Sequence, residues 1–163
     1  MINLKTKETY SIVIFLTATV TLLTAYFIQY ILGYQPCNLC LIERVPYALS
    51  LVVLIFNFKF KKNQVFNAVL LMLIFLFSII ISIYHFGIEQ GFINESNICK
   101  ADNINLLITR ESILESFQKM NVSCKDVTIK IFGLSLTTYN IIVSLIMFLI
   151  SVKIFKINNE TNK

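Results

Sequence analysis

Hydrophobic residues gather along this chain into four long runs separated by polar segments. The runs cover residues 10–32, 42–58, 65–86 and 134–154, and Lys, Arg, Asp and Glu occur only near their ends. About 20 consecutive apolar residues with few charges are typical of a helix that crosses a lipid bilayer. The pattern therefore predicts a single membrane domain with four transmembrane helices.

Composition and charge support a membrane protein and give it an orientation. Hydrophobic residues make up 56% of the 163-residue chain and charged residues 14%, whereas about a quarter of an average soluble domain is charged. The N-terminal segment, the 59–64 loop and the C-terminal tail hold eight basic and two acidic residues, and the other segments hold six basic and seven acidic ones. By the positive-inside rule, both termini and the 59–64 loop are cytoplasmic, and the loops 33–41 and 87–133 are external. The net charge of +5 thus reflects topology and does not indicate nucleic-acid binding.

All four cysteines fall in the two external loops. Cys37 and Cys40 lie in the short first loop, and Cys99 and Cys124 lie in the long second one. An even number of cysteines confined to one compartment indicates disulfide chemistry in an oxidising space such as the bacterial periplasm. We therefore expect an all-α membrane protein, a four-helix transmembrane bundle with two external cysteine-bearing loops.

The two cysteine pairs differ in what a disulfide would do for them. A bridge between Cys99 and Cys124 would close a loop of about 25 residues and stabilise the fold by about 3–4 kcal/mol, so a structural role is open. A Cys37–Cys40 bridge closes almost no loop, and Cys-x-x-Cys pairs are often exchangeable. Zinc bound by four thiolates would need a second close pair, and the single histidine, His85, lies at a helix end, so we expect no metal site.

Arg44 and Pro46 help to place the start of the second helix. Proline is tolerated in a first helical turn, so we expect the helix to begin near Ile42 and Cys40 to lie just ahead of it, where the helix dipole favours a thiolate. Arg44 would reach back toward the Cys40 sulfur. The alternative is an arginine that extends to the bilayer surface. Only two of the 14 basic residues are arginine, which favours a specific role.

These residues resemble the DsbB family of quinone-dependent membrane disulfide oxidases. The similarity rests on Cys-x-x-Cys-x-x-x-Arg with Gln29 eight residues ahead of it, on four spans, on Cys99 and Cys124 in the second external loop, and on the segments YHFGIEQG (84–91) and FGLS (132–135). It covers essentially the whole chain. Family members often carry a tryptophan in the second external loop or near the last helix, and this chain has none.

The resemblance implies an activity, a cofactor and partners. The activity is the reoxidation of a soluble, periplasmic DsbA-like oxidase with a thioredoxin fold, and the electrons pass to ubiquinone or menaquinone in the bacterial inner membrane. The partner would attack the Cys99–Cys124 bridge at Cys99, and the freed Cys124 would attack Cys37. Cys40 would then pass the electrons to the quinone, with Arg44 stabilising the anion that forms.

His85 has two interpretations. A histidine among aromatic residues at a helix end is commonly an interfacial residue or a partner of the helix dipole. The resemblance instead implies a quinone contact, and His85 with Glu89 or Glu43 could relay the protons that quinone reduction consumes.

The long loop contains a further candidate helix. Apolar residues in TRESILESFQKM (109–120) share one helical face, which predicts either a helix lying on the membrane surface or a small face packed within the loop.

Three alternatives remain open from the sequence. One is an enzyme like vitamin K epoxide reductase, although that family keeps its quinone-facing Cys-x-x-Cys within a late helix and the last span here has no cysteine. Another is a non-catalytic scaffold with two structural disulfides. The third is a DsbI-like member that serves one client.

Overall fold

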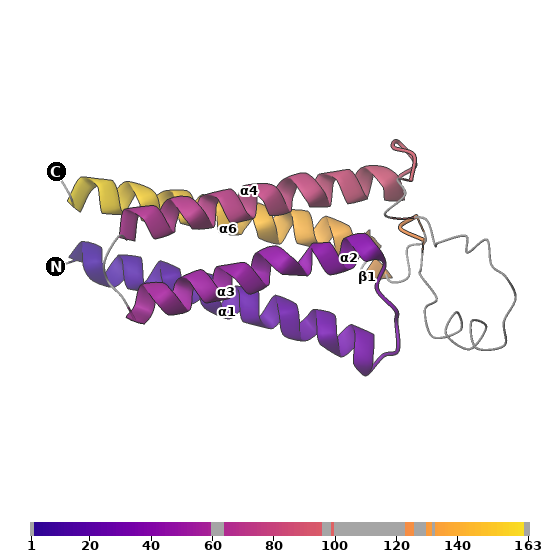
Figure 1. The fold of residues 1–163 in the computed structure, drawn as a ribbon, viewed down its shortest axis with the longest axis horizontal. Helices are drawn as coiled ribbons and strands as arrows, with labels where there is room; N and C mark the ends of the chain where they lie inside the picture. Colours follow the sequence, from indigo (N-terminus) through magenta and orange to yellow (C-terminus); the bar gives the residue numbers. More distant parts are fainter. Residues whose placement is uncertain are drawn as a thin grey trace, which may run out of the picture.

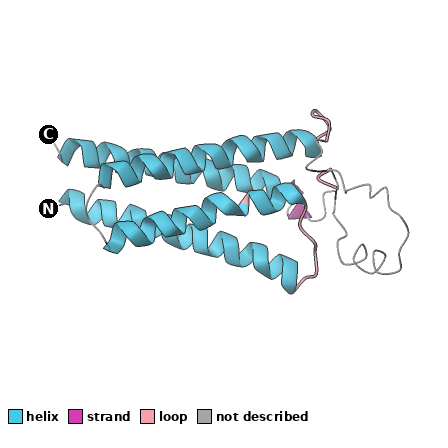
Figure 2. Ribbon diagram, in the orientation of Figure 1, coloured by secondary structure: helices cyan, strands magenta, loops and turns pink. Residues whose placement is uncertain are grey.

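The computed structural model describes residues 2–59, 64–95, 99, 123–125, 130–131 and 133–161. Four long helical segments lie side by side, and a two-stranded antiparallel ladder precedes the last of them (Figures 1 and 2). The elements are α1 (Ile2–Tyr30), α2 (Asn38–Ile42), α3 (Arg44–Lys59), α4 (Gln64–Glu89), β1 (Lys130–Ile131), β2 (Leu134–Ser135) and α6 (Leu136–Thr161). The prediction of an all-α, four-helix membrane bundle is confirmed, and the short ladder is a feature that the sequence did not predict.

The cysteine-bearing segments lie at one end of the bundle. The start of α1, the end of α3, the start of α4 and the end of α6 lie at the other end (Figure 1). The α1–α2 connection and the chain that follows α4 therefore both lie at the end opposite to the termini. The predicted amphipathic helix at 109–120 lies outside the described residues.

The bundle has the dimensions and the surface of a membrane domain. Four helical spans are long and apolar enough to cross a bilayer: Thr6–Tyr30, Asn38–Lys59, Gln64–Glu89 and Leu136–Asn159. Large apolar side chains cover the outside, among them Leu16, Leu23, Phe77, Ile80 and Leu149. Apolar groups facing outward along every span are what a lipid environment requires, so the chain is a multi-pass membrane protein.

Two helices, α2 and α3, form the second span. Pro46 lies in the first turn of α3 and has no N–H to donate to the Ile42 carbonyl, and a turn residue, Glu43, separates the two helices. The Glu43 N–H still donates to the Leu39 carbonyl at 2.9 Å. The chain thus passes from α2 into α3 with one broken helical bond instead of a loop.

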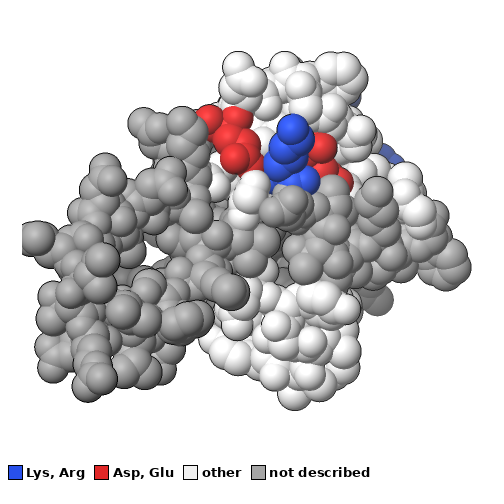
Figure 3. Space-filling view, turned by 90° about the vertical axis from the view of Figure 1, so that its right-hand side faces the viewer, with Lys and Arg blue, Asp and Glu red and all other residues white. Residues whose placement is uncertain are grey.

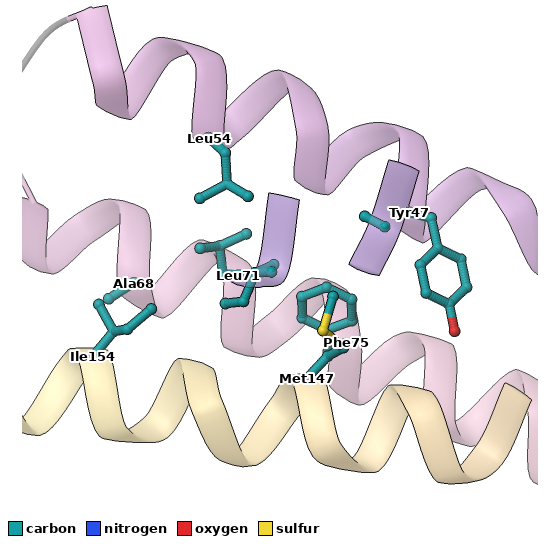
Figure 4. Close-up of a cluster of buried hydrophobic side chains, with 9 residues drawn as sticks. Tyr47, Leu54, Ala68, Leu71, Phe75, Met147 and Ile154 are labelled. Atoms are coloured by element: carbon teal, nitrogen blue, oxygen red, sulfur yellow. The ribbon is translucent and has the colours of Figure 1, made fainter. Parts of the chain in front are cut away.

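The most extensive helix contact is between α4 and α6. Small buried side chains, including Ser78 and Ser82 on α4 and Ser144 on α6, lie in this interface. Small residues let membrane helices approach closely, where van der Waals contact and hydrogen bonds replace the hydrophobic effect as the source of attraction. A buried apolar cluster that includes Phe75 and Met147 continues the core toward α3 (Figure 4).

Helix α4 ends in a Schellman motif. Gly91 has φ +77°, a left-handed conformation that favours glycine. Its N–H donates to the Ile88 carbonyl at 3.0 Å, and the Phe92 N–H donates to the Gly87 carbonyl at 2.9 Å. These two bonds satisfy two carbonyls in the last turn of α4 at the point where the helix ends.

Candidate active site

Two disulfides lie together at the loop end of the bundle. Cys37 is bonded to Cys40, and Cys99 is bonded to Cys124. Cys37, Cys99 and Cys124 are each at most 5% exposed and belong to one buried cluster, and Cys40 packs against this cluster. The fold therefore brings together two cysteine pairs from different loops.

The sulfur of Cys37 caps the helix that carries Cys40. Its Sγ accepts a hydrogen bond from the Cys40 N–H at 3.2 Å, and Cys37 is the N-cap residue of α2. We predicted that the helix would begin near Ile42 with Cys40 ahead of it, and this was wrong. Helix α2 begins at Asn38, so Cys40 lies inside the helix. The sequence did not reveal this start because the cap is a thiol sulfur instead of a Ser, Thr, Asp or Asn oxygen.

His85 joins the first cysteine pair to a buried carboxylate. Its Nε2 lies 3.6 Å from the Cys37 Sγ, and its Nδ1 lies 2.9 Å from the Glu43 Oε1. The Thr137 Oγ1 also approaches Nδ1, at 3.5 Å. His85 is 4% and Glu43 8% exposed. When the Nδ1–H donates to the carboxylate, the lone pair of a neutral Nε2 faces Cys37.

Arg44 makes its hydrogen bonds with α1. Its Nη1 donates to the Gln29 Oε1 at 2.6 Å, its Nη2 donates to the Ala25 carbonyl at 3.5 Å, and its guanidinium carbon lies 5.1 Å from the centre of the Tyr26 ring. We expected Arg44 to reach back toward Cys40. Among the described residues its hydrogen bonds instead tie the start of α3 to the end of α1.

A cavity of about 490 Å³ lies between these groups and α1. Its polar side includes Cys37, Cys40, Arg44, His85 and Cys124, and its apolar side includes residues of α1 such as Val20, Leu22 and Ile28. Clefts of this size with apolar walls and a few converging polar groups are typical ligand sites. The structure thus places all predicted site residues except Cys99 on the lining of one cavity.

Two buried polar atoms on the cavity lining have no hydrogen-bond partner among the described residues. They are the Arg44 Nε and the Glu89 Oε2. A buried donor without a partner costs about 1–3 kcal/mol, so the Arg44 side chain, which lies on the cavity lining, has one donor left to satisfy. Figure 3 views this end of the molecule, where acidic and basic side chains lie next to each other in the part that the structure describes.

A closed set of hydrogen bonds lies inside the bundle next to the cavity. The Tyr47 hydroxyl donates to the Asn140 Oδ1 and lies 2.9 Å from the Ser144 Oγ, and the Asn140 Nδ2 donates to the Ser82 Oγ at 2.7 Å. Ser78 connects Ser144 to Ser82, since its Oγ lies 2.8 Å from the Ser144 Oγ and its carbonyl accepts a hydrogen bond from the Ser82 hydroxyl. These polar residues connect α3, α4 and α6. We did not single them out from the sequence, although polar residues four positions apart in apolar runs were a visible signal.

Comparison with known proteins decides the family. The family model described as "Disulfide bond formation protein DsbB" matches residues 7–154. The chain belongs to the DsbB family. It is also 29% identical, over 153 residues, to the uncharacterized protein RP370 of Rickettsia prowazekii (strain Madrid E). The aligned part covers 91% of this chain and 89% of that protein. No solved structure matches the chain.

Membership in the DsbB family, together with two cysteine pairs in one cluster, supports a membrane disulfide oxidase. The four cysteines occupy positions where exchange between two bridges is chemically reasonable, since they share one cluster. The family membership also argues against the alternative of an enzyme like vitamin K epoxide reductase.

Proposed function

We propose that this DsbB-family protein oxidises a soluble, thioredoxin-like partner of the DsbA type and passes the electrons to a membrane quinone, ubiquinone or menaquinone. One observation carries the proposal. The Cys37–Cys40 disulfide lines a largely apolar cavity together with Cys124 of the second disulfide and with Arg44, whose Nε has no hydrogen-bond partner among the described residues. A bridge in this position can exchange with the second disulfide and meet an apolar acceptor in the cavity.

The cavity suits a quinone headgroup. Its α1 wall is largely apolar, and the Nε of Arg44, a residue of the lining, lacks an acceptor among the described residues. A quinone, when bound, takes up two electrons and two protons. Arg44 would hold a quinone oxygen and offset the negative charge that develops there. Gln29 and Tyr26 would fix the direction of the guanidinium through the hydrogen bond and the ring contact described above.

Successive thiol–disulfide exchanges would move two electrons from the partner to the Cys37–Cys40 pair. A partner thiolate attacks Cys99, which breaks the Cys99–Cys124 bond and frees Cys124 as a thiolate. The Cys124 thiolate attacks the Cys37 Sγ, which forms a Cys37–Cys124 bond and releases Cys40 as a thiolate beside the cavity. The partner's second thiol then displaces Cys99, and Cys99 displaces Cys37 to restore its own bridge. Two electrons and two protons have then moved from the partner to Cys37 and Cys40.

His85 and Glu43 would handle the proton at Cys37. With the Nδ1–H donated to Glu43, the Nε2 at 3.6 Å can take a proton from the Cys37 thiol and return it. The buried carboxylate stabilises the imidazolium formed in between. His85 acts directly on the sulfur in this proposal, and Glu43 is a positioning residue.

The same proposal places the protein in the bacterial inner membrane, with both termini cytoplasmic and the cysteine loops periplasmic. Support comes from the lysine-rich segments 1–9, 59–64 and 153–163 and from the cysteine pairs at the end opposite to the termini. Reporter fusions test it. A C-terminal fusion to alkaline phosphatase should be inactive and a fusion to a fluorescent protein bright, and the reverse pattern contradicts the orientation.

The test of the activity is anaerobic reduction of a quinone by a reduced thioredoxin-like partner. We expect turnover by the parent, none by Cys40→Ser, and weakened quinone use by Arg44→Ala. Lys156→Ala, which removes an exposed cation from the other end of the bundle, is the matched control and should behave like the parent. Parental rates in both Cys40→Ser and Arg44→Ala would rule out the proposal.

A scaffold with two structural disulfides makes a different prediction. Its bridges should be indifferent to quinone, whereas the proposed enzyme, once reduced, should lose two free thiols per quinone added. Thiol titration with and without quinone, in the absence of oxygen, distinguishes the two.

A further inference from the structure

Three metal-ligand atoms meet beside the cavity. The Sγ atoms of Cys37 and Cys40 and a ring nitrogen of His85 all lie within 4.8 Å of one another. We propose that the reduced Cys37–Cys40 pair, together with His85, binds a thiophilic divalent cation such as Zn²⁺ or Cd²⁺, and that the bound ion blocks reoxidation of the pair. The proposal rests on the pair being reducible, as the proposed function requires, and does not depend on a quinone.

The spacing of the ligand atoms fits a tetrahedral ion. Zinc–sulfur bonds of about 2.3 Å and zinc–nitrogen bonds of about 2.0–2.1 Å place the two ligand atoms about 3.6 Å apart at a tetrahedral angle. The Cys37 Sγ and the His85 Nε2 are 3.6 Å apart. Once the disulfide is reduced, the two sulfurs need to separate to about 3.8 Å, and two cysteines with two residues between them are a common ligand spacing for zinc.

The groups around His85 and Cys37 favour the His85 tautomer and the Cys37 thiolate that bind a metal ion. The Glu43 Oε1 lies 2.9 Å from the His85 Nδ1. When the Nδ1–H donates to this oxygen, the lone pair of Nε2 is directed at Cys37. A carboxylate behind a ligating histidine fixes the ring and makes it a better ligand. The Cys40 N–H donates to the Cys37 Sγ at 3.2 Å, and such a bond stabilises a thiolate.

The cavity supplies the fourth coordination position. Cys37, Cys40 and His85 all lie on its lining, so three protein ligands would leave one position for water. Binding converts two thiols to thiolates, releases two protons for each ion, and transfers no electrons. Both sulfurs would then be held by the ion, so neither could reform the disulfide. The sequence did not suggest this site because His85 is 48 residues from Cys37 and reaches it only through the packing of α4.

The experiment uses reduced protein without a histidine tag, because His85 is the chain's single histidine. A Cys99→Ser/Cys124→Ser background leaves only one thiol pair. The protein is reduced with a phosphine, desalted without oxygen and titrated with Cd²⁺, whose thiolate complexes absorb in the ultraviolet. X-ray absorption at the zinc edge then reads the ligands of one bound Zn²⁺.

We expect one ion per chain, two sulfur ligands and one imidazole ligand, and no binding to the oxidised protein. His85→Ala should weaken binding by about 100-fold or more, and Glu43→Gln by about 10-fold. Glu8→Gln, near the N-terminus of α1, should bind like the parent.

Three results would overturn the inference. They are no binding by the reduced double-serine protein, a zinc spectrum without a nitrogen ligand, and parental affinity in a folded His85→Ala variant. If His85→Ala fails to fold, the spectrum of the background protein still decides the question. Failure of this inference can be distinguished from failure of the proposed function. Quinone reduction without metal binding contradicts only the metal site, and metal binding without quinone reduction contradicts only the proposed function.

Discussion

Replacing Glu43 with glutamine tests the contact between a carboxylate and His85. The change keeps the shape of the side chain and removes its charge. Glu43 is 8% exposed, and its Oε1 lies 2.9 Å from the His85 Nδ1. A hydrogen bond to a charged group contributes about 1.5–3 kcal/mol. If that contact stabilises the imidazolium while Cys37 exchanges, its loss slows the step by about 10- to 150-fold. The Thr137 hydroxyl, 3.5 Å from the same nitrogen, is a weak replacement.

The assay follows one exchange step. Oxidised protein is mixed with a reduced thioredoxin-like partner, the reaction is stopped with acid at short times, and free thiols are alkylated, so that each disulfide form is counted. Glu43→Gln should slow the step in which Cys99 displaces Cys37 from the Cys37–Cys124 bond and change the pH profile of that step, while attack on Cys99–Cys124 keeps its parental rate. A variant that is only less stable would keep the parental pH profile. Glu8→Gln is the control, and a parental rate and profile for Glu43→Gln would refute the role.

Three further predictions concern the core and the cavity. Tyr47→Phe should destabilise the bundle by about 1–2 kcal/mol in a denaturant titration, because the hydroxyl makes two buried hydrogen bonds. Such bonds in membranes average about 0.6 kcal/mol, with a maximum near 1.7. An unchanged stability would contradict this prediction. Phe75→Ala, at a residue that is 0% exposed, should lower the free energy of unfolding by about 3–5 kcal/mol. Phe77→Ala, at a residue that is 53% exposed, should change it by no more than about 0.5 kcal/mol. Equal losses in the two variants would show that burial does not determine the stability effect. Gln29→Ala should raise the KM for quinone about 10-fold without slowing attack by the partner, because it frees the Nη1 of Arg44. An unchanged KM contradicts that role.

The helices were predictable because a bilayer imposes a simple rule on sequence. Every span must satisfy its own backbone and face lipid with apolar side chains, so length and hydropathy alone identify the four spans. Their ends were less predictable. The second span gains a turn at its start because the Cys37 sulfur caps α2 and Pro46 permits a broken bond, and sequence patterns for helix starts describe oxygen caps.

Contacts across the bundle were the least predictable part of the site. The cysteines could be chosen from their spacing and compartment, and Arg44 from the scarcity of arginine. The partners of Arg44 and His85 depend on how α1, α3 and α4 are rotated about their axes, and the four spans are apolar on most sides, so hydropathy gives little information on rotation. Only the fold places Glu43 against His85 across 42 residues of sequence.

The most direct test of the central proposal is the redox state of Cys37 and Cys40 during anaerobic turnover. Protein that has been reduced by a thioredoxin-like partner is given a stoichiometric amount of quinone, and the disulfides are mapped by alkylation and mass spectrometry. The proposal predicts that the Cys37–Cys40 bridge re-forms, that one quinone is reduced for each bridge, and that Cys40→Ser abolishes both. A quinone reduced at the parental rate without Cys40, or a bridge that stays open with quinone present, would contradict it.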